Sequence, residues 1–177
     1  MKKIILLQTL LFSSFCAFAQ GYKIEKVDSV AKSKSEIYSS TKSFIAQTWN
    51  SAQDVIQNDD KENGIIIVKG ILREDVYATK LSPDPTKYTY SYTIKFMMKD
   101  NKYKIVAEDI FCTSAYCETV KWPKIEISDL PVYPGLWKCS LKEEKYMALI
   151  ESVKYHLKQV VESYDNSLKT KPVIEDF

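Results

Sequence analysis

The chain has 177 residues, of which 25 are basic and 23 acidic, so its formal net charge at pH 7 is only +2. A net charge this small gives no whole-molecule electrostatic reason to expect a nucleic-acid or anionic-membrane partner. The length is close to that of one domain, and no internal repeat or Gly/Ser linker divides the sequence.

The N-terminus has the pattern of a signal peptide for export. Two lysines precede an apolar run over residues 4–12, and Ala17-Phe18-Ala19 marks a cleavage site. We therefore expect residues 1–19 to be a leader and residues 20–177 to be one domain in the periplasm or at the cell exterior. Removal of the leader would leave equal numbers of basic and acidic residues. No later stretch approaches the ~20 apolar residues of a transmembrane helix, so we expect none in the mature chain.

Cys16 offers an alternative, because a cysteine just past an apolar run can be the acylated residue of a bacterial lipoprotein. Lipoprotein processing favours a small residue directly before the cysteine, whereas this chain has the bulky Phe15 there. We therefore expect cleavage after Ala19. A diacylated Cys16 at the mature N-terminus would overturn the expected localisation.

The first two elements expected in the mature chain are a strand and an amphipathic helix. Residues 22–30 alternate weakly, which predicts a short strand. From Ser33 the apolar period becomes helical, and Ser33 with Glu36 predicts a capping box at the start of the helix. The helix is expected to end near Asn50. Its predicted buried stripe consists of Ile37, Tyr38, Phe44, Ile45, Thr48 and Trp49.

A hairpin is expected next, built around Asn63 and Gly64. Residues 54–57 are expected to be extended, and the Asn-Gly pair supplies the left-handed residues of a tight turn. Residues 65–72 then return as the partner strand. Residues 65–68 are apolar on both faces of a pleat, which predicts a strand inside the sheet with neighbours above and below it.

The clearest strand signal follows a Pro-containing loop at residues 82–85. Residues 88–98 alternate between apolar and polar, which predicts a strand with one buried and one solvated face. The side chains expected in the core are Tyr88, Tyr90, Tyr92, Ile94, Phe96 and Met98. Those expected on the solvated face include Thr89, Ser91, Thr93, Lys95 and Lys99.

A turn at residues 100–102 leads into the last predicted strand, over residues 103–112. That strand is expected to bury one side, made of Tyr103, Ile105, Ala107 and Phe111. Residues 113–139 fit neither period and are interrupted by three prolines, so we expect an aromatic-anchored loop that closes one end of the core.

A second helix is expected to open with a capping box of Ser140 and Glu143. Its predicted buried stripe consists of Tyr146, Ile150, Val153, Leu157, Val160, Tyr164 and Leu168. The order of elements is thus strand, helix, four strands and helix. Five antiparallel strands and two amphipathic helices predict a two-layer α+β domain, with both helices on one face of a curved sheet.

Four short segments within residues 33–72 carry a resemblance to a known family. They are residues 35–38, 44–49, 54–64 and 68–70. These segments resemble a family of exported Bacteroidota proteins, a domain of unknown function with a TATA-box-binding-protein-like fold. The resemblance implies a curved antiparallel sheet backed by two helices. It implies no catalytic residue, since none is established for the family, and the name of the fold does not imply DNA binding. The chain departs from the family over residues 112–139.

Three cysteines remain after the expected leader, namely Cys112, Cys117 and Cys139. A compartment outside the cytoplasm permits disulfides, so one pair can form and one thiol remains over. We favour a disulfide between Cys112 and Cys117, because only four residues separate them. Cys139 could replace either partner.

The sequence contains no clear pattern for a metal, a cofactor or a catalytic nucleophile. His156, the only histidine, lies one position from the apolar stripe and is expected to be a solvated or half-buried helix residue. The acidic residues within 59–62 fail the EF-hand pattern, since Lys61 and Gly70 would fall at ligand positions. The glycines are too scattered to form a phosphate-binding loop. We therefore expect no metal and no cofactor.

We interpret the chain as a non-enzymatic binding module that uses the sheet face left uncovered by the helices, with the 113–139 loop as a rim. On the 88–98 strand, the candidate binding residues are Thr89, Ser91, Thr93, Lys95 and Met97. The expected partner is an unknown protein or an envelope ligand. The alternative is a hydrolase whose carboxylates, such as Glu108 and Asp109, lie under the 113–139 loop.

Overall fold

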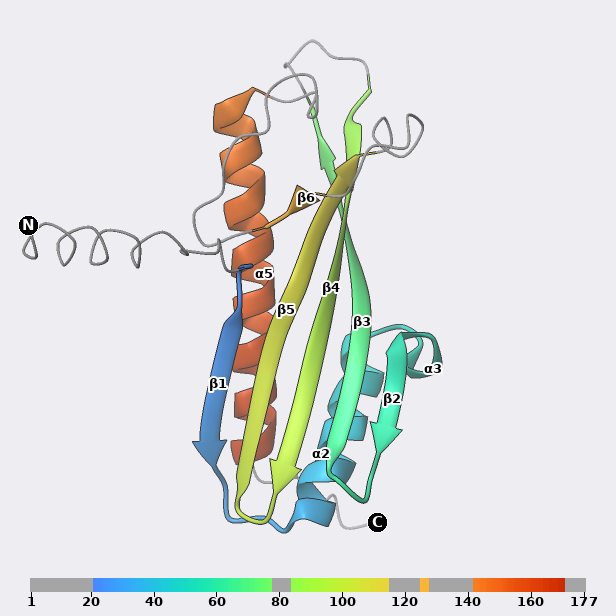
Figure 1. Cartoon of the computed structure of the whole chain (residues 1–177), viewed down its shortest axis with the longest axis vertical. Coiled ribbons are helices and arrows are strands. Elements are labelled where there is room, and N and C mark those ends of the chain that lie inside the picture. Colours follow the sequence, from blue (N-terminus) through green and yellow to red (C-terminus); the bar gives the residue numbers. More distant parts are fainter. Residues whose placement is uncertain (1–20, 78–83, 115–124, 128–141, 171–177) are drawn as a thin grey trace, which may run out of the picture.

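The computed structural model describes residues 21–77, 84–114, 125–127 and 142–170. One layer is an antiparallel sheet and the other consists of two long helices (Figure 1), so the predicted two-layer α+β fold is confirmed. The strands are β1 (Ile24–Ser29), β2 (Ile56–Asp60), β3 (Ile65–Val76), β4 (Thr86–Lys99), β5 (Lys102–Ser114) and β6 (Ile125–Glu126). The helices are α2 (Lys34–Thr48), α3 (Ala52–Val55) and α5 (Glu143–Lys169).

The sheet has the strand order β1-β5-β4-β3-β2, and every pair is antiparallel. The predicted five-stranded antiparallel sheet is therefore confirmed. The two-residue β6 pairs with β5 beside this path, within the region expected to be a loop. Ile127 anchors it, because its N–H donates to the Ile110 carbonyl at 2.8 Å and its carbonyl accepts from the Tyr22 N–H at 2.8 Å.

Helix α2 begins at the predicted capping box. The Ser33 hydroxyl accepts from the Glu36 N–H at 3.3 Å, and the Glu36 carboxylate accepts from the Ser33 N–H at 2.7 Å. The buried residues of the helix are Ile37, Thr41, Phe44 and Ile45. The cap and the apolar stripe together fix both the start of the helix and the face that packs on the sheet.

Gly70 makes room for an aromatic ring that joins the end of α2 to the sheet. Gly70 of β3 and Tyr92 of β4 are paired, and a Cβ on Gly70 would lie 2.3 Å from the Tyr92 side chain. The ring therefore occupies the space that a side chain at position 70 would fill. The Tyr92 hydroxyl in turn accepts from the Trp49 indole N–H at 3.2 Å.

Two local predictions before β3 are wrong, the first of them only in part. Of the segment 54–57 expected to be extended, residues 54 and 55 lie in the helical turn Ala52–Val55, because the Ser51 hydroxyl caps the Asp54 N–H at 3.4 Å, whereas residues 56 and 57 are extended in β2 as predicted. In the hairpin Gly64 alone is left-handed, with φ +67°. The Asp60 carboxylate accepts from the Asn63 N–H at 2.9 Å and from the Asn63 amide at 2.7 Å, which holds a longer loop over residues 61–64 in place of the tight turn.

Strand β4 has the predicted alternation. Its inner side chains, Tyr88, Tyr90, Tyr92, Ile94, Phe96 and Met98, are all buried. The first half of β5 also follows the prediction, since Tyr103, Ile105 and Ala107 are buried. These residues lie under the helices because α2 packs on β4, and α5 on β1 and β5.

A bulge in β5 changes which residues face the helices. The register between β4 and β5 shifts there, and the extra residue Asp109 has a left-handed backbone with φ 54°. Beyond it, Ile110 and Cys112 are the buried residues. Phe111, which the strict alternation placed in the core, is half-buried and pairs with Ser91 on the opposite face. The prediction for Phe111 is therefore wrong.

Helix α5 buries the predicted stripe, with Val160 only half-buried. The helix begins at Glu143 with Lys142 as its N-cap and without a side-chain capping bond. The predicted capping box of Ser140 and Glu143 is therefore wrong, and Ser140 lies outside the described residues.

Tyr164 of α5 is the centre of the aromatic core. Its ring meets Phe44, Phe96 and Tyr103 edge-on, at centroid distances of 5.3, 4.9 and 5.5 Å. Its hydroxyl lies 2.8 Å from the hydroxyl of the buried Thr41 on α2. One side chain therefore joins both helices to β4 and β5.

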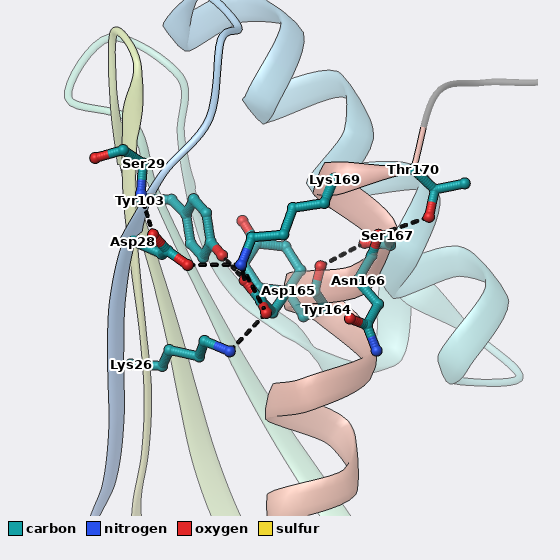
Figure 2. A network of polar contacts seen from close by, with 10 residues as sticks. All are labelled: Lys26, Asp28, Ser29, Tyr103, Tyr164, Asp165, Asn166, Ser167, Lys169 and Thr170. Atoms are coloured by element: carbon teal, nitrogen blue, oxygen red, sulfur yellow. Dashed lines mark hydrogen bonds and ion pairs between the residues drawn. The ribbon is translucent and has the colours of Figure 1, made fainter.

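A polar network ties the last turns of α5 to β1 (Figure 2). The buried Asp165 carboxylate contacts the ammonium groups of Lys26 at 2.5 Å and Lys169 at 2.8 Å, and it accepts from the Tyr103 hydroxyl. Lys169 also reaches Asp28 at 2.6 Å. Burial alone would raise the pKa of Asp165, but the hydrogen bonds from Lys169, Lys26 and Tyr103 outweigh it and lower the pKa to about 2.

Candidate functional site

The helices leave one face of the sheet uncovered, and the strands lie in front of both long helices in Figure 1. We call this surface the open face. The predicted residues Thr89, Ser91, Thr93, Lys95 and Met97 all lie on it, because they alternate with the buried inner side chains of β4. Four of them are half-buried, and Thr93 is only 6% exposed. The structure thus brings these five residues together on one surface, while their role in binding stays a prediction.

Strand β3 adds apolar residues to the open face that the sequence interpretation missed. Ile66 and Val68 are buried, whereas Ile65 and Ile67 point to the open face and are half-buried. Ile71, on the same face, is 61% exposed. The prediction that residues 65–68 have layers above and below is therefore wrong, because no described helix covers this face. The apolar residues at 65 and 67 thus form part of an apolar surface and do not pack under a second layer of described helices.

A hollow lies on the open face beside the β4–β5 turn. Strand pairing places one residue from each of four strands in a row, namely Ile65, Met97, Lys104 and Val27. Val27 is 46% exposed. Lys99 and Lys102 form the next row. Together these residues line a volume of about 430 Å³. We call it the hairpin-end hollow, and it combines an apolar floor with a rim of lysines.

A second, more polar hollow of about 640 Å³ lies farther along the open face, and we call it the central hollow. Its lining includes Asp54, Gln57, Lys69, Ile71, Ser91, Thr93, Asp109 and Phe111. Two of these, Ser91 and Thr93, are predicted site residues. The bulge gives Asp109 a left-handed backbone that residues other than glycine adopt uncommonly. Alternation alone could not place Phe111 here, because the bulge reverses the alternation.

Ion pairs link the strands between the two hollows. Lys95 of β4 contacts Glu108 of β5, and Lys104 contacts Glu25 of β1 at 2.6 Å. Hydrogen bonds from Lys104 and Lys23 hold the pKa of Glu25 below its usual value. Among the described residues, Lys99 and Lys102 form no ion pair. The hairpin-end hollow therefore has positive charge that the described acidic residues do not pair.

The carboxylates named for the hydrolase alternative are separated by the bulge. Glu108 is held by Lys95, while Asp109 is exposed and lines the central hollow. Residues 115–124 and 128–139 of the loop expected above them lie outside the described residues. Glu108 and Asp109 are therefore not arranged as an acid and a base on either side of one substrate.

The other residues considered in the sequence, His156 and the acidic residues within 59–62, form ion pairs and hydrogen bonds with neighbouring side chains. The exposed His156 Nε2 lies 3.6 Å from the Glu74 carboxylate, which confirms a solvated helix histidine. Among the acidic residues within 59–62, Asp59 of β2 contacts the Lys42 ammonium at 2.7 Å and accepts a hydrogen bond from the Tyr38 hydroxyl. The hydrogen bond to Asp59, together with the partial burial of the Tyr38 ring, raises the pKa of Tyr38 to about 12. Throughout the part of the chain that the structure describes, no group of three His, Cys, Asp or Glu could hold a metal ion.

Cys112 is buried on the helix side of β5. Burial raises the pKa of the neighbouring Tyr90, and the Cys112 thiol contributes to the same shift. Cys117 and Cys139 lie outside the described residues, so the Cys112–Cys117 disulfide stays a prediction. None of the described helices has the length and apolar character needed to cross a membrane.

Known proteins with the same fold are similar to this chain over most of its length. A structure from Bacteroides ovatus, a DUF4468 family protein, matches with a TM-score of 0.63 at 13% identity and covers 88% of this chain and 90% of its own. A TBP-like protein from Parabacteroides distasonis matches with a TM-score of 0.53 at 18% identity, over 82% of this chain and 94% of its own. No curated protein matches the sequence.

The model of one family matches residues 24–112, which run from β1 to the part of β5 beyond the bulge. That family is described as a domain of unknown function with a TBP-like fold. The matched segment contains every residue of the predicted site on β4, and the two solved structures share the fold around it. The chain belongs to the DUF4468 family.

Proposed function

We propose that this protein is an exported, non-enzymatic interaction module that docks a partner protein or an envelope ligand on its open face. The observation that carries the proposal is the apolar content of that face. Its main apolar residues are Val27, Ile65, Ile67, Ile71 and Met97. Apolar patches with polar rims are typical of interaction sites, since a merely solvated face needs only polar residues.

The charges of the open face favour a partner that carries acidic groups beside apolar ones. Lys99 and Lys102, which pair with no described acidic residue, lie beside the apolar floor of the hairpin-end hollow. An acidic group of the partner would meet these two ammonium groups while its apolar neighbours cover Met97 and Ile65. Such complementarity contributes mainly to the specificity and the rate of association.

Export is part of the proposal, and it rests on the pattern of residues 1–19. Fractionation of the native cell and the mass of the mature N-terminus test it. We expect the protein outside the cytoplasm, beginning at Gln20. An uncleaved cytoplasmic chain would contradict export, and a diacylated Cys16 would replace the proposed free form with a lipoprotein.

The binding test fills each hollow with a long side chain. Ser91→Arg enters the central hollow and Met97→Arg the hairpin-end hollow. The matched control is Tyr155→Arg, since Tyr155 is 60% exposed on α5. Partners are cross-linked in the native envelope, co-purified and quantified by mass spectrometry, while thermal melts verify that each variant folds.

We expect the two open-face variants to lose partners that the control retains. Identical partners and yields for all three variants would show that the open face does not bind, and the proposal would be wrong.

A further inference from the structure

Strand β3 is much longer than the strand that covers its outer edge. β3 has 12 residues and β2 has five, and β2 pairs only with residues 65–68. On its other side β3 pairs with β4 as far as Val76. Figure 1 shows β3 continuing past the end of β2. Within the described ranges, no strand pairs with the outer edge of residues 71–76, which we call the free edge.

The opposite side of the sheet is covered more completely. Along β5, β1 pairs with residues 102–107 and β6 with residues 111 and 112. Among the described residues, the strands at the ends of the sheet, β1 and β2, also have unpaired outer edges, but of the two long strands beside them β3 has the longer uncovered stretch. At about 3.3 Å per residue, the free edge offers roughly 20 Å of strand.

The backbone groups of the free edge point outward. The Gly64 carbonyl accepts from the Met98 N–H at 2.8 Å, so the backbone groups of residue 64 point toward β4. Successive residues of a strand point these groups to opposite edges, and the β3–β4 register has no shift. The N–H and C=O groups of Ile71, Arg73 and Asp75 consequently point away from β4. At the end of this edge, the Tyr77 carbonyl accepts from the Lys145 ammonium.

Two hollows flank the free edge, one on each face of the sheet. Ile71 lines the central hollow on the open face, and it also lines a hollow of about 420 Å³ on the helix side. The helix-side hollow is formed in part by Trp49, Leu72, His156 and Val160. Ile71 itself is 61% exposed between the two hollows. Successive side chains of an added strand would point to opposite faces of the sheet, so the two hollows could each receive side chains from one extended chain.

We propose that the free edge binds an extended segment of a partner protein, which adds to the sheet as a strand in line with β2. Main-chain hydrogen bonds to Ile71, Arg73 and Asp75 supply the affinity. Alternate side chains of the added strand enter the two hollows, so apolar residues alternate with polar ones in the segment. This inference rests on the proposed binding function and names the class of partner.

The first test selects ligands from a displayed library of random short peptides with the purified protein and measures hydrogen exchange with and without a selected peptide. We expect binding to slow exchange of the Ile71, Arg73 and Asp75 amides. Failure to enrich any peptide, or protection confined to other amides, would overturn the proposal. Protection of these amides in the protein alone, together with concentration-dependent dimers, would assign the edge to a second copy of the chain and likewise overturn it.

The second test separates the backbone from the side chain. Ile71→Pro removes an outward N–H and leaves the β3–β4 bonds in place, whereas Ile71→Thr keeps both the N–H and the β-branched shape. We expect Ile71→Pro to weaken binding of the selected peptides by roughly tenfold or more, which is about 1.4 kcal/mol, and Ile71→Thr to keep most of the affinity. Equal affinity of Ile71→Pro and the unmodified protein would overturn strand addition.

The two proposals can fail separately. Met97 pairs with Ile65, which β2 covers, so Met97→Arg leaves the free edge intact. If cross-linked partners are lost with Met97→Arg and kept with Ile71→Pro, the open face binds and strand addition is wrong. If partners are lost with Ile71→Pro but kept with both Ile71→Thr and Met97→Arg, and the Ile71→Pro protein is folded, the edge binds and the open-face proposal is wrong.

Discussion

The two faces of the sheet differ most clearly at neighbouring residues of β4. Phe96 is fully buried and meets the rings of Phe44 and Tyr164, whereas Met97 is half-buried on the open face. The first face is packed by α2 and α5, and the second presents isoleucines, lysines and two hollows. The comparison shows that the helices pack on one face of the sheet, whereas the other face, for which we propose binding, has no described helix on it.

The sharpest test of this comparison replaces Phe96 and Met97 with alanine. Phe96→Ala leaves a cavity among the core rings and should lower the free energy of unfolding by about 3–5 kcal/mol. Met97→Ala should lower it by no more than about 1 kcal/mol, since its side chain is already partly in water. Urea unfolding followed by circular dichroism measures both. Equal losses would show that the open face is as tightly packed as the other.

The buried polar network extends the comparison to charge. Asp165→Asn leaves Lys26 and Lys169 without their shared carboxylate and should cost about 2–3 kcal/mol at neutral pH. Asp28→Asn, at the exposed end of the network, is the control and should have a smaller effect. A loss with Asp165→Asn no larger than that of the control would contradict a structural role for this carboxylate.

The same carboxylate should make stability depend on pH. Its pKa is about 2 in the folded protein against the ordinary value of 3.8 for an aspartate, so on acidification the unfolded chain takes up the proton first. Its contribution is present above about pH 4 and is lost as the pH falls toward 2, by about 2 kcal/mol. Urea titrations across this range should show the loss in the unmodified protein and a weaker slope in Asp165→Asn. Parallel slopes would contradict the assignment.

Gly70 tests the packing at the margin of the covered face. Gly70→Ala forces a methyl group against the Tyr92 ring and should cost about 1–3 kcal/mol. The same substitution in a Tyr92→Ala background should cost less, because the obstructing ring is gone. A double-mutant cycle by urea unfolding measures the coupling. Additive effects would mean that the ring and the glycine do not constrain each other.

The smallest effect is expected on the open face itself. Lys95→Ala removes the ion pair with Glu108, whose partners are 39% and 22% exposed, and should change stability by less than about 1 kcal/mol. The variant should fold normally, and its difference in stability from the unmodified protein should become smaller in high salt. A loss as large as that of Asp165→Asn would show that this face also supports the fold.

Regular patterns made most of the fold predictable. The alternation of β4, the stripe of α5 and the capping box at Ser33 each depend on neighbours in sequence, and the structure confirms them. The failures involve competing local bonds. Ser51 caps a turn where the sequence suggested an extended segment, and Asp60 ties down Asn63 where a tight turn was expected.

The candidate site was only partly predictable, for two physical reasons. The bulge at Asp109 moves Phe111 to the open face, and nothing in a period of two shows where such a bulge occurs. An apolar run such as residues 65–68 fits a buried strand and a binding surface equally well, because both require apolar residues on each face. The free edge of β3 depends on how far β2 extends beside it, which only the strand pairing reveals.

The contacts in Figure 2 also limit when the first strand and the last helix can meet as the chain is made. Lys26 and Asp165 are 139 residues apart, and Asp28 and Lys169 are 141 apart. The first strand therefore cannot form these ion pairs with the last helix until the ribosome has made the chain as far as Asp165 and Lys169. A chain that ends before Asp165 contains all of β3, β4 and β5 but lacks both ion pairs between β1 and α5. Completion of the domain is thus a late event that follows translation of the last helix.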